Sequence, residues 1–313
     1  MNIVFFGTPD FAAAALSAIH AAGHTVRAVV TQPDKPRGRS GKLQASPVKE
    51  FALAQDIPVW QPVRVREASA VEQLRGTDAE VFVVAAFGQI LPQEVLDIPA
   101  LGCINIHASL LPALRGASPI QTAILEGAEE TGITIMRMDA GCDTGEILLQ
   151  ERIAIAPEDT AGSLFDKLAA LGAETIVKAL PMLAEGKLVP RKQEDDKATH
   201  AAKFTKESGR IDWTKDAAYL SRLVRAMNPW PCAYTSLQGK GCKIWTATAE
   251  EENAAGEAMA PGSVLRAEAE GIFVQTGEGV LRVTELQLEG KKRMPVTDFL
   301  NGSRLTAGEH FGG

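Results

Sequence analysis

The sequence predicts an α/β protein in which a Rossmann-like domain with a mostly parallel sheet is followed by a small β-barrel (OB-like) domain. Up to about residue 200, short apolar runs alternate with helical patterns, which favours parallel strands joined by helical crossovers. From about Arg210 the pattern changes to short, glycine-rich strands. The 313 residues also exceed the size at which a single core usually keeps growing. Two domains are therefore expected.

The elements of the first domain follow from hydrophobic periodicity. Apolar runs predict buried strands at residues 3–6, 26–31, 81–86 and 103–107, with later strands at 132–138 and 146–155. Helical patterns predict helices at 11–22, 47–55 and 119–126 and a long closing helix at 163–183.

The second domain is expected to begin with one helix at 217–227. Strands should follow at 243–247, 262–265, 271–275 and 280–288. The stretch 187–206 is polar and weakly patterned, which is typical of a connection between domains. We therefore expect domains at 1–189 and 208–313, with a linker at 190–207.

Composition and cysteine spacing exclude several classes of protein. A formal charge of -7 argues against nucleic-acid binding through the whole surface, so any such contact must be local. No apolar run is long enough to span a bilayer, and the first residues lack the features of a signal peptide. The four cysteines show neither metal-ligand spacing nor a dense disulfide pattern, so we expect no metal, no membrane association and a reducing cytoplasm.

The first strand ends in the run Gly7-Thr8-Pro9-Asp10-Phe11. A dinucleotide-binding protein would carry two further glycines here, which admit a pyrophosphate to the helix N-terminus. Their absence argues against a nicotinamide- or flavin-dependent oxidoreductase, although the order of elements is similar.

Polar side chains gather where the strand 103–107 ends. Asn105 and His107 are two residues apart, so both can leave the same face of that strand, at the edge where α/β sheets place their sites. Asp143 lies in a glycine-flanked turn between two predicted strands. An amide, an imidazole and a carboxylate can stabilise an oxyanion, hold a nucleophile and carry its proton, which are the tasks of acyl transfer without a covalent enzyme intermediate. Taken singly, His107 could be a structural residue and Asp143 a turn former.

A basic segment carries four cations in eight residues, Lys35, Arg37, Arg39 and Lys42. Its glycine and proline content is too high for a helix or a central strand. A local contact with phosphates is one interpretation, and a solvated, mobile surface loop is the other.

Three strings together resemble the folate-dependent formyltransferases: Phe6–Phe11, Asn105–Gly116 and Asp139–Gly145. The similarity covers essentially the whole chain, including the basic segment, the stretch Lys203–Lys206 and the run Asn228–Pro231. The resemblance implies transfer of a formyl group from 10-formyltetrahydrofolate to the α-amino group of methionyl initiator tRNA, for translation initiation. We expect a monomer.

The same resemblance implies roles for individual residues. Asn105 and His107 would stabilise the oxyanion, and Asp143 would orient His107 and help to carry the proton. Two loops would surround the folate, namely Ser109, Leu110, Leu111 and Pro112 together with Phe87, Gly88, Gln89, Ile90 and Leu91. The cations expected to contact the tRNA are Lys35, Arg37, Arg39, Lys42 and Lys206. The run Lys291–Arg293 is either a further contact or a solvated hairpin tip.

Three other functions remain open from the sequence. A glycinamide ribonucleotide or amino-sugar nucleotide formyltransferase would keep the catalytic residues but leave the barrel and basic segment without a purpose. A formyltetrahydrofolate hydrolase would use water as the acceptor. A noncatalytic tRNA-binding protein would leave the grouping of Asn105, His107 and Asp143 unexplained.

Overall fold

The computed structural model describes residues 1–37, 42–250 and 259–312. The chain forms two compact units. The first comprises Met1–Pro119, Glu130–Ala154 and Phe165–Ala201, and the second Ile120–Glu129, Ile155–Leu164 and Ala202–Gly313.

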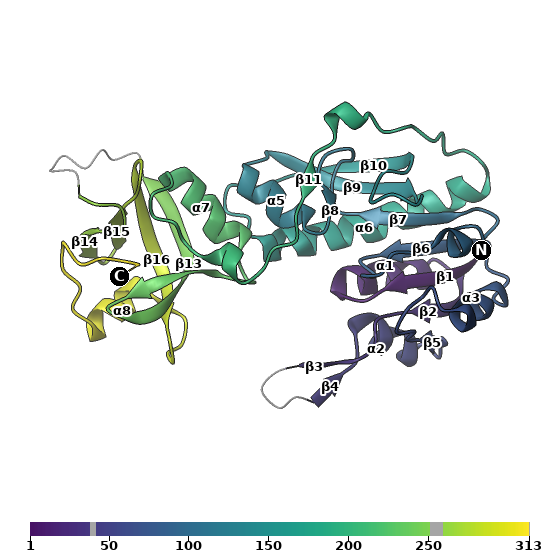
Figure 1. Ribbon diagram of the computed structural model, residues 1–313, viewed down its shortest axis with the longest axis horizontal. Helices are drawn as coiled ribbons and strands as arrows, with labels where there is room; N and C mark the ends of the chain where they lie inside the picture. The colour runs from purple at the N-terminus through teal and green to yellow at the C-terminus, as the bar shows by residue number, and fades with distance from the viewer. Residues whose placement is uncertain (38–41, 251–258, 313) are drawn as a thin grey trace. The chain divides into compact units, whose positions relative to one another are not determined.

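A seven-stranded sheet forms the centre of the first unit, with the order β10-β9-β7-β6-β1-β2-β5 (Figure 1). The pairs among β1, β2, β5, β6 and β7 are parallel, whereas β9 is antiparallel to both β7 and β10. This confirms the mostly parallel α/β sheet. The strands are β1 (Asn2–Gly7), β2 (Thr25–Val30), β5 (Val59–Trp60), β6 (Val81–Ala85), β7 (Cys103–His107), β9 (Glu130–Arg137) and β10 (Ile147–Ala154).

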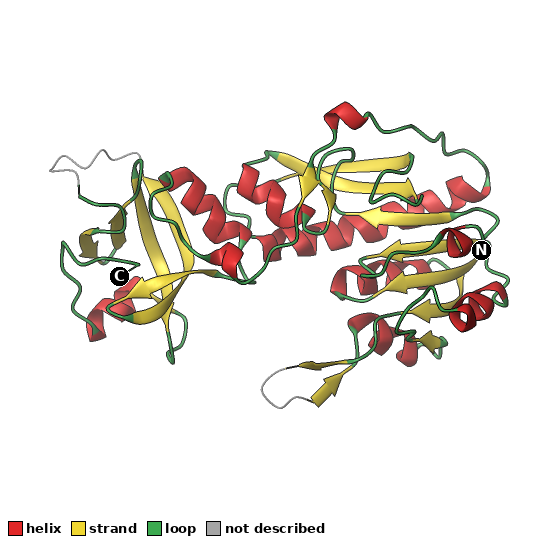
Figure 2. Ribbon diagram, in the orientation of Figure 1, coloured by secondary structure: helices red, strands yellow, loops and turns green. Residues whose placement is uncertain are grey.

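Helices connect these strands, as Figure 2 shows in red. They are α1 (Asp10–Ala21), α2 (Pro47–Ala54), α3 (Ala68–Arg75), α4 (Gln93–Leu96) and α5 (Pro119–Glu126), and α6 (Ala161–Ala184) follows the last strand. Most of α5 and the first turn of α6 belong to the second unit. Helix α2 begins where Ser46 accepts a hydrogen bond from the Lys49 backbone N–H, with Pro47 in the first turn, which is a favourable start for a helix. The predicted helices are confirmed to within two residues at their ends.

Close packing explains the glycine that ends β1. A Cβ atom at Gly7 would lie 2.5 Å from the Cβ of Ala12 and 3.0 Å from the carbonyl oxygen of Ala85. Only glycine therefore lets α1 pack directly against the end of the strand. The preceding residue, Phe6, is fully buried, and its ring centroid lies 5.4 Å from that of Phe87. This contact anchors the loop after β6 in the core.

The basic segment belongs to a hairpin that projects from the first unit (Figure 1), formed by β3 (Lys35–Arg37) and β4 (Lys42–Gln44). Its base is tied to the sheet. Lys49 Nζ lies 2.7 Å from Asp34 Oδ2, and Gln61 Nε2 donates to Asp34 Oδ1 at 2.7 Å and to the Gln32 carbonyl at 2.9 Å. These bonds lower the pKa of Asp34, first through the hydrogen bond from Lys49.

The second unit contains a six-stranded antiparallel sheet in which β12-β13-β16-β15-β14 are neighbours and β17 pairs with β16. The chain's end joins the two edges, because Phe311 bridges Leu237 of β12 and His310 bridges Ser263, next to β14. This arrangement confirms the small barrel. The elements are α7 (Ala217–Ala226), β12 (Ala233–Leu237), β13 (Lys240–Glu250), β14 (Val264–Glu268), β15 (Gly271–Gln275), β16 (Val280–Leu288), β17 (Met294–Pro295) and α8 (Val296–Gly302).

Across the described ranges 1–37, 42–250 and 259–312, none of the helices is both long and apolar enough to cross a membrane.

Candidate active site

His107 ends β7, and its ring is held between two oxygen atoms. The side chain is 6% exposed, and Nε2 lies 3.0 Å from the carbonyl oxygen of Leu114. A carbonyl oxygen can only accept a hydrogen bond, so Nε2 carries a proton and donates it there. The other nitrogen, Nδ1, faces Asp143 Oδ2 at 3.7 Å. Nδ1 is therefore the position at which a proton can arrive or leave.

Asp143 occupies the turn between β9 and β10 in a left-handed conformation, with φ of 56°. Its Oδ2 accepts a hydrogen bond from the Gly116 N–H at 2.8 Å, and the carboxylate is 17% exposed. The distance to His107 is too long for a direct hydrogen bond, but catalytic hydrogen bonds often shorten only when the substrate is bound. The structure thus brings together His107, from a strand end, and Asp143, from a turn much later in the sequence.

Asn105 completes the group on β7. It lies two residues before His107, on the same face of the strand, and is half-buried. Its side-chain amide has no hydrogen-bond partner among the residues that the structure describes. A half-buried amide without a protein partner is able to donate to a ligand oxygen.

The turn after β7 is organised by a threonine that the sequence analysis did not single out. Thr134 of β9 lies opposite His107 and is fully buried. Its Oγ1 donates to the Ser109 carbonyl at 2.7 Å and accepts from the Leu111 N–H at 3.1 Å. Gln150 Nε2 adds a bond to the Leu111 carbonyl at 2.9 Å. The available signal was a polar residue inside an otherwise apolar strand, where a hydroxyl needs partners.

The other positions expected near the folate differ in exposure. Ser109 and Leu111 are buried, while Leu110 and Pro112 are half-buried. In the loop after β6, Phe87 and Leu91 pack into the core, and Ile90 is 87% exposed. Gly88 adopts a positive φ of 85°.

Gln89, in the same loop, uses its side chain within the protein. Its Oε1 accepts from the Val65 N–H at 2.8 Å, and its Nε2 donates to the Pro62 carbonyl at 3.2 Å. The side chain therefore fixes a neighbouring loop of the first unit, and only Ile90 presents a large apolar side chain outward.

The expected tRNA contacts are less fully described. Lys35 is exposed, the backbones of Arg37 and Lys42 are paired across the hairpin, and Arg39 lies outside the described residues. Lys206, in the second unit, is exposed.

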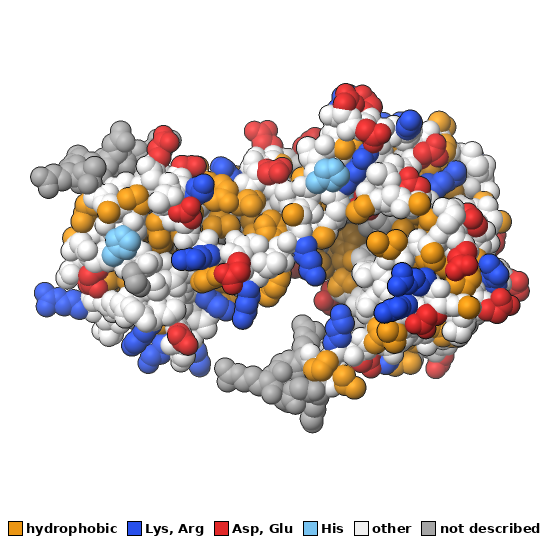
Figure 3. Space-filling view, viewed as in Figure 1, with side chains coloured by type: hydrophobic (Ala, Val, Ile, Leu, Met, Phe, Trp, Pro, Cys, Tyr) orange, Lys and Arg blue, Asp and Glu red, His pale blue; other side chains and the backbone are white. Residues whose placement is uncertain are grey.

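The run Lys291–Arg293, also in the second unit, contains one residue that is already paired. Arg293 donates to Glu285 at 2.6 Å and covers the ring of Trp245 at 4.6 Å from its centroid. The hydrogen bond from Arg293 lowers the pKa of Glu285. Lys291 and Lys292 are exposed, and Figure 3 shows further lysine and arginine side chains along the lower rim of this unit.

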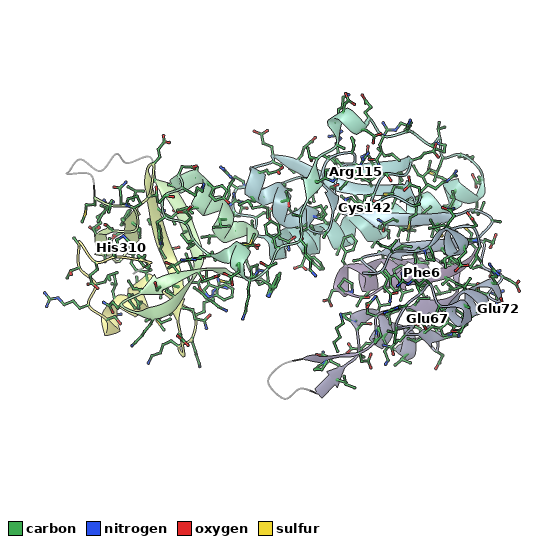
Figure 4. All side chains as sticks on the ribbon, in the orientation of Figure 1. Phe6, Glu67, Glu72, Arg115, Cys142 and His310 are labelled. Atoms are coloured by element: carbon green, nitrogen blue, oxygen red, sulfur yellow. The ribbon has the colours of Figure 1, made fainter. Side chains whose placement is uncertain are left out.

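Cys142, which is labelled with Arg115 in Figure 4, adjoins the Asp143 carboxylate. Its Sγ lies 3.8 Å from Asp143 Oδ2. Partial burial of the thiol and the negative charge of Asp143 raise the pKa of Cys142, so this thiol is a poor nucleophile. The part of the chain that is described contains no cluster of three or more histidine, cysteine or acidic side chains suited to a metal ion.

Comparisons with known proteins agree along the chain. The family model for formyl transferase matches residues 1–180, and the model for the formyl transferase C-terminal domain matches residues 203–304. Methionyl-tRNA formyltransferase of Chromobacterium violaceum is 51% identical over 313 residues, covering 100% of both chains. That of Agathobacter rectalis is 48% identical over 311 residues, covering 99% of each.

A solved structure shares the fold. It is the N-formyltransferase from Helicobacter canadensis in complex with folinic acid and dTDP-3-aminofucose, with a TM-score of 0.67 and 19% identity. The match covers 90% of this chain and 98% of that one.

Proposed function

The chain belongs to the formyl transferase family, and we propose that it transfers a formyl group from 10-formyltetrahydrofolate to the α-amino group of methionyl initiator tRNA. One observation supports the chemistry: His107, which faces Asp143, leaves the same face of β7 as Asn105, whose amide has no hydrogen-bond partner among the described residues. The identity of the acceptor rests on relatives of about half-identical sequence that match both units over their full length.

The donor supplies an electrophilic formyl carbon, and the aminoacyl nitrogen attacks it. This nucleophile needs no strong base, because a free α-amino group has a pKa of about 7.7–8.0 and is partly neutral at pH 7. As the new C–N bond forms, electrons move onto the formyl oxygen. The Asn105 amide is placed to donate hydrogen bonds to that oxygen, where fixed donors stabilise developing charge.

His107 and Asp143 then manage the proton. The nitrogen of the acceptor loses a proton as the bond between the formyl carbon and the folate nitrogen breaks, and the leaving nitrogen gains one. We assign acceptance of the first proton to the Asp143 carboxylate, which then passes it to the leaving folate nitrogen, so that the reaction takes up no net proton. The Nδ1 atom of His107, 3.7 Å from that carboxylate, stabilises the proton there, while Nε2 stays bonded to Leu114. We therefore assign stabilisation of the oxyanion to Asn105 and stabilisation of the transferred proton to His107.

The folate is expected between the turn Ser109–Pro112 and the loop Phe87–Leu91, with Ile90 as the apolar side chain directed outward. The tRNA acceptor end carries closely spaced phosphates, which the cations of the projecting hairpin and Lys206 suit. A cytoplasmic location and a monomeric state stay predictions.

Mass spectrometry of methionyl-tRNA after incubation with 10-formyltetrahydrofolate tests the proposal. Formyl-methionine on the tRNA is the expected product, and His107→Ala or Asn105→Ala should lower turnover at least about a hundredfold in a folded protein. Parallel reactions with glycinamide ribonucleotide, an amino-sugar nucleotide or no acceptor identify the alternative enzymes. Formylation of one of those acceptors alone, or release of formate with water alone, would contradict the proposed acceptor.

A further inference from the structure

The segment Arg191–Ala201, which we name the strap, is hydrogen-bonded to the residues that follow His107 and to the turn that carries Asp143. The Leu114 N–H donates to Thr199 Oγ1 at 2.9 Å, and the Arg115 N–H donates to the Thr199 carbonyl at 2.9 Å. Strand β11 (His200–Ala201) then pairs with β8 (Arg115–Gly116). The strap thereby fixes both backbone groups that hold the catalytic pair, the Leu114 carbonyl bonded to His107 and the Gly116 N–H bonded to Asp143.

Gln193 connects the strap to Asp143 itself. Its side chain is 4% exposed, and Nε2 donates to the Asp143 carbonyl at 2.8 Å and to the Gly145 carbonyl at 2.7 Å. Because the backbone of Asp143 is left-handed, the turn needs support from outside to hold this conformation. The Gln193 side-chain amide therefore forms hydrogen bonds with the turn on both sides of Thr144.

Arg115 fixes the orientation of that amide. Its guanidinium is buried, donates through Nε to Gln193 Oε1 at 3.0 Å, and through another nitrogen to Asp195 Oδ1 at 2.8 Å. A guanidinium can only donate, so the oxygen of Gln193 must face Arg115 and its NH₂ group must face the two carbonyls. The hydrogen bond from Arg115 also lowers the pKa of Asp195, which keeps this partner charged.

We propose that Gln193 is a positioning residue for the reaction, and that it acts by holding the Asp143 turn so that the carboxylate faces His107 Nδ1. The inference rests on the proposed formyl transfer and adds to it a residue of the strap. Gln193 bonds to the backbone of Asp143 and not to its carboxylate or to the His107 ring. Its loss should therefore lower turnover while leaving the binding of both substrates nearly unchanged.

Two variants separate the donor role of Gln193 from its packing. Gln193→Glu keeps the size and the acceptor for Arg115 but loses both donors, so that a carboxylate oxygen faces the Asp143 and Gly145 carbonyls. Gln193→Met keeps the volume and removes all polar atoms. Each should lower kcat about tenfold to a hundredfold, the scale of a catalytic group displaced by about 1 Å, with little change in either KM.

A matched control is Gln275→Met in the second unit. Gln275 Nε2 likewise donates to two carbonyls, those of Thr276 at 3.0 Å and Gly279 at 3.4 Å, but it lies in the barrel. This variant should keep kcat. Thermal unfolding of all three proteins shows that the measured chains are folded.

The decisive measurement is a double-mutant cycle with Asp143→Asn. If Gln193 acts through Asp143, then Gln193→Met should reduce kcat little or not at all once the carboxylate is gone. Equal reductions in both backgrounds would show a general structural effect and overturn the inference, as would full kcat in Gln193→Glu. If the unaltered protein forms no formyl-methionyl-tRNA, the proposed function itself has failed, which is a distinct result.

Discussion

Replacing Thr134 with valine should destabilise the first unit more than any other change of equal size on β9. Valine keeps the shape of the buried side chain but removes the hydroxyl that serves Ser109 and Leu111. Two buried backbone groups are left without that partner, at about 1–3 kcal/mol each. Their sum is about 2–6 kcal/mol, and since losses above about 4 kcal/mol are exceptional for one substitution, we expect about 2–4 kcal/mol in the free energy of unfolding.

Urea unfolding followed by circular dichroism measures this loss, with Thr131→Val as the control. Thr131 lies on the same strand and is 2% exposed, and its side chain forms no hydrogen bond among the described residues. Valine at this control position should be close to neutral, because the Thr131 hydroxyl satisfies no other group among the described residues. Equal unfolding free energies for the two variants would contradict the inference that the Thr134 hydroxyl stabilises the turn after β7.

Three further changes test other parts of the structure. Gly116→Ala should cost about 2 kcal/mol or more in thermal unfolding, because φ is +115° there and the new Cβ would lie 2.7 Å from the Ala201 carbonyl oxygen. Replacing one cation of the segment 35–42 with alanine should raise the KM for the tRNA but not for the folate. The slope of log KM for the tRNA against log salt concentration should also become shallower, by about 0.9 or less. An unchanged slope after all four cations are replaced would contradict the phosphate contact. Asp143→Asn should accelerate alkylation of Cys142 by iodoacetamide at pH 8, since the carboxylate raises the pKa of that thiol and its removal lets more thiolate form, and an unchanged rate would contradict that coupling.

Local patterns predicted the elements that carry most of the core. Strand β7 has the predicted bounds 103–107. It pairs with β6 on one side and with β9 on the other, and a short, mostly buried run is typical of such a central strand. Strand β5 was missed because its two residues, Val59–Trp60, are too few to show a period. The hairpin β3–β4 was foreseen only as a segment unfit for a helix, since prolines and glycines exclude structures more readily than they specify them.

The candidate catalytic residues could be proposed from sequence because each stands at a local signal, a strand end or a glycine-flanked turn. The sequence could not predict which way their side-chain atoms point. That Nε2 of His107 is occupied by the Leu114 carbonyl depends on the course of the turn between them, and it shifts the proposed oxyanion role toward Asn105. The sequence also could not predict that the Gln89 side chain forms hydrogen bonds with the backbone of Pro62 and Val65.

The strap shows why a polar stretch between domains is hard to interpret. Residues 191–201 lack hydrophobic period, and this predicted a linker at 190–207. Their side chains, however, make bonds over long sequence separations, 78 residues from Gln193 to Arg115 and 50 to Asp143. A buried carbonyl must find a donor somewhere, and here the donors come from the connection. The contacts group these residues with the first unit as far as Ala201. Cutting the chain at residue 189 would therefore remove the donors that hold the Asp143 turn, whereas cutting it after residue 201 would keep them.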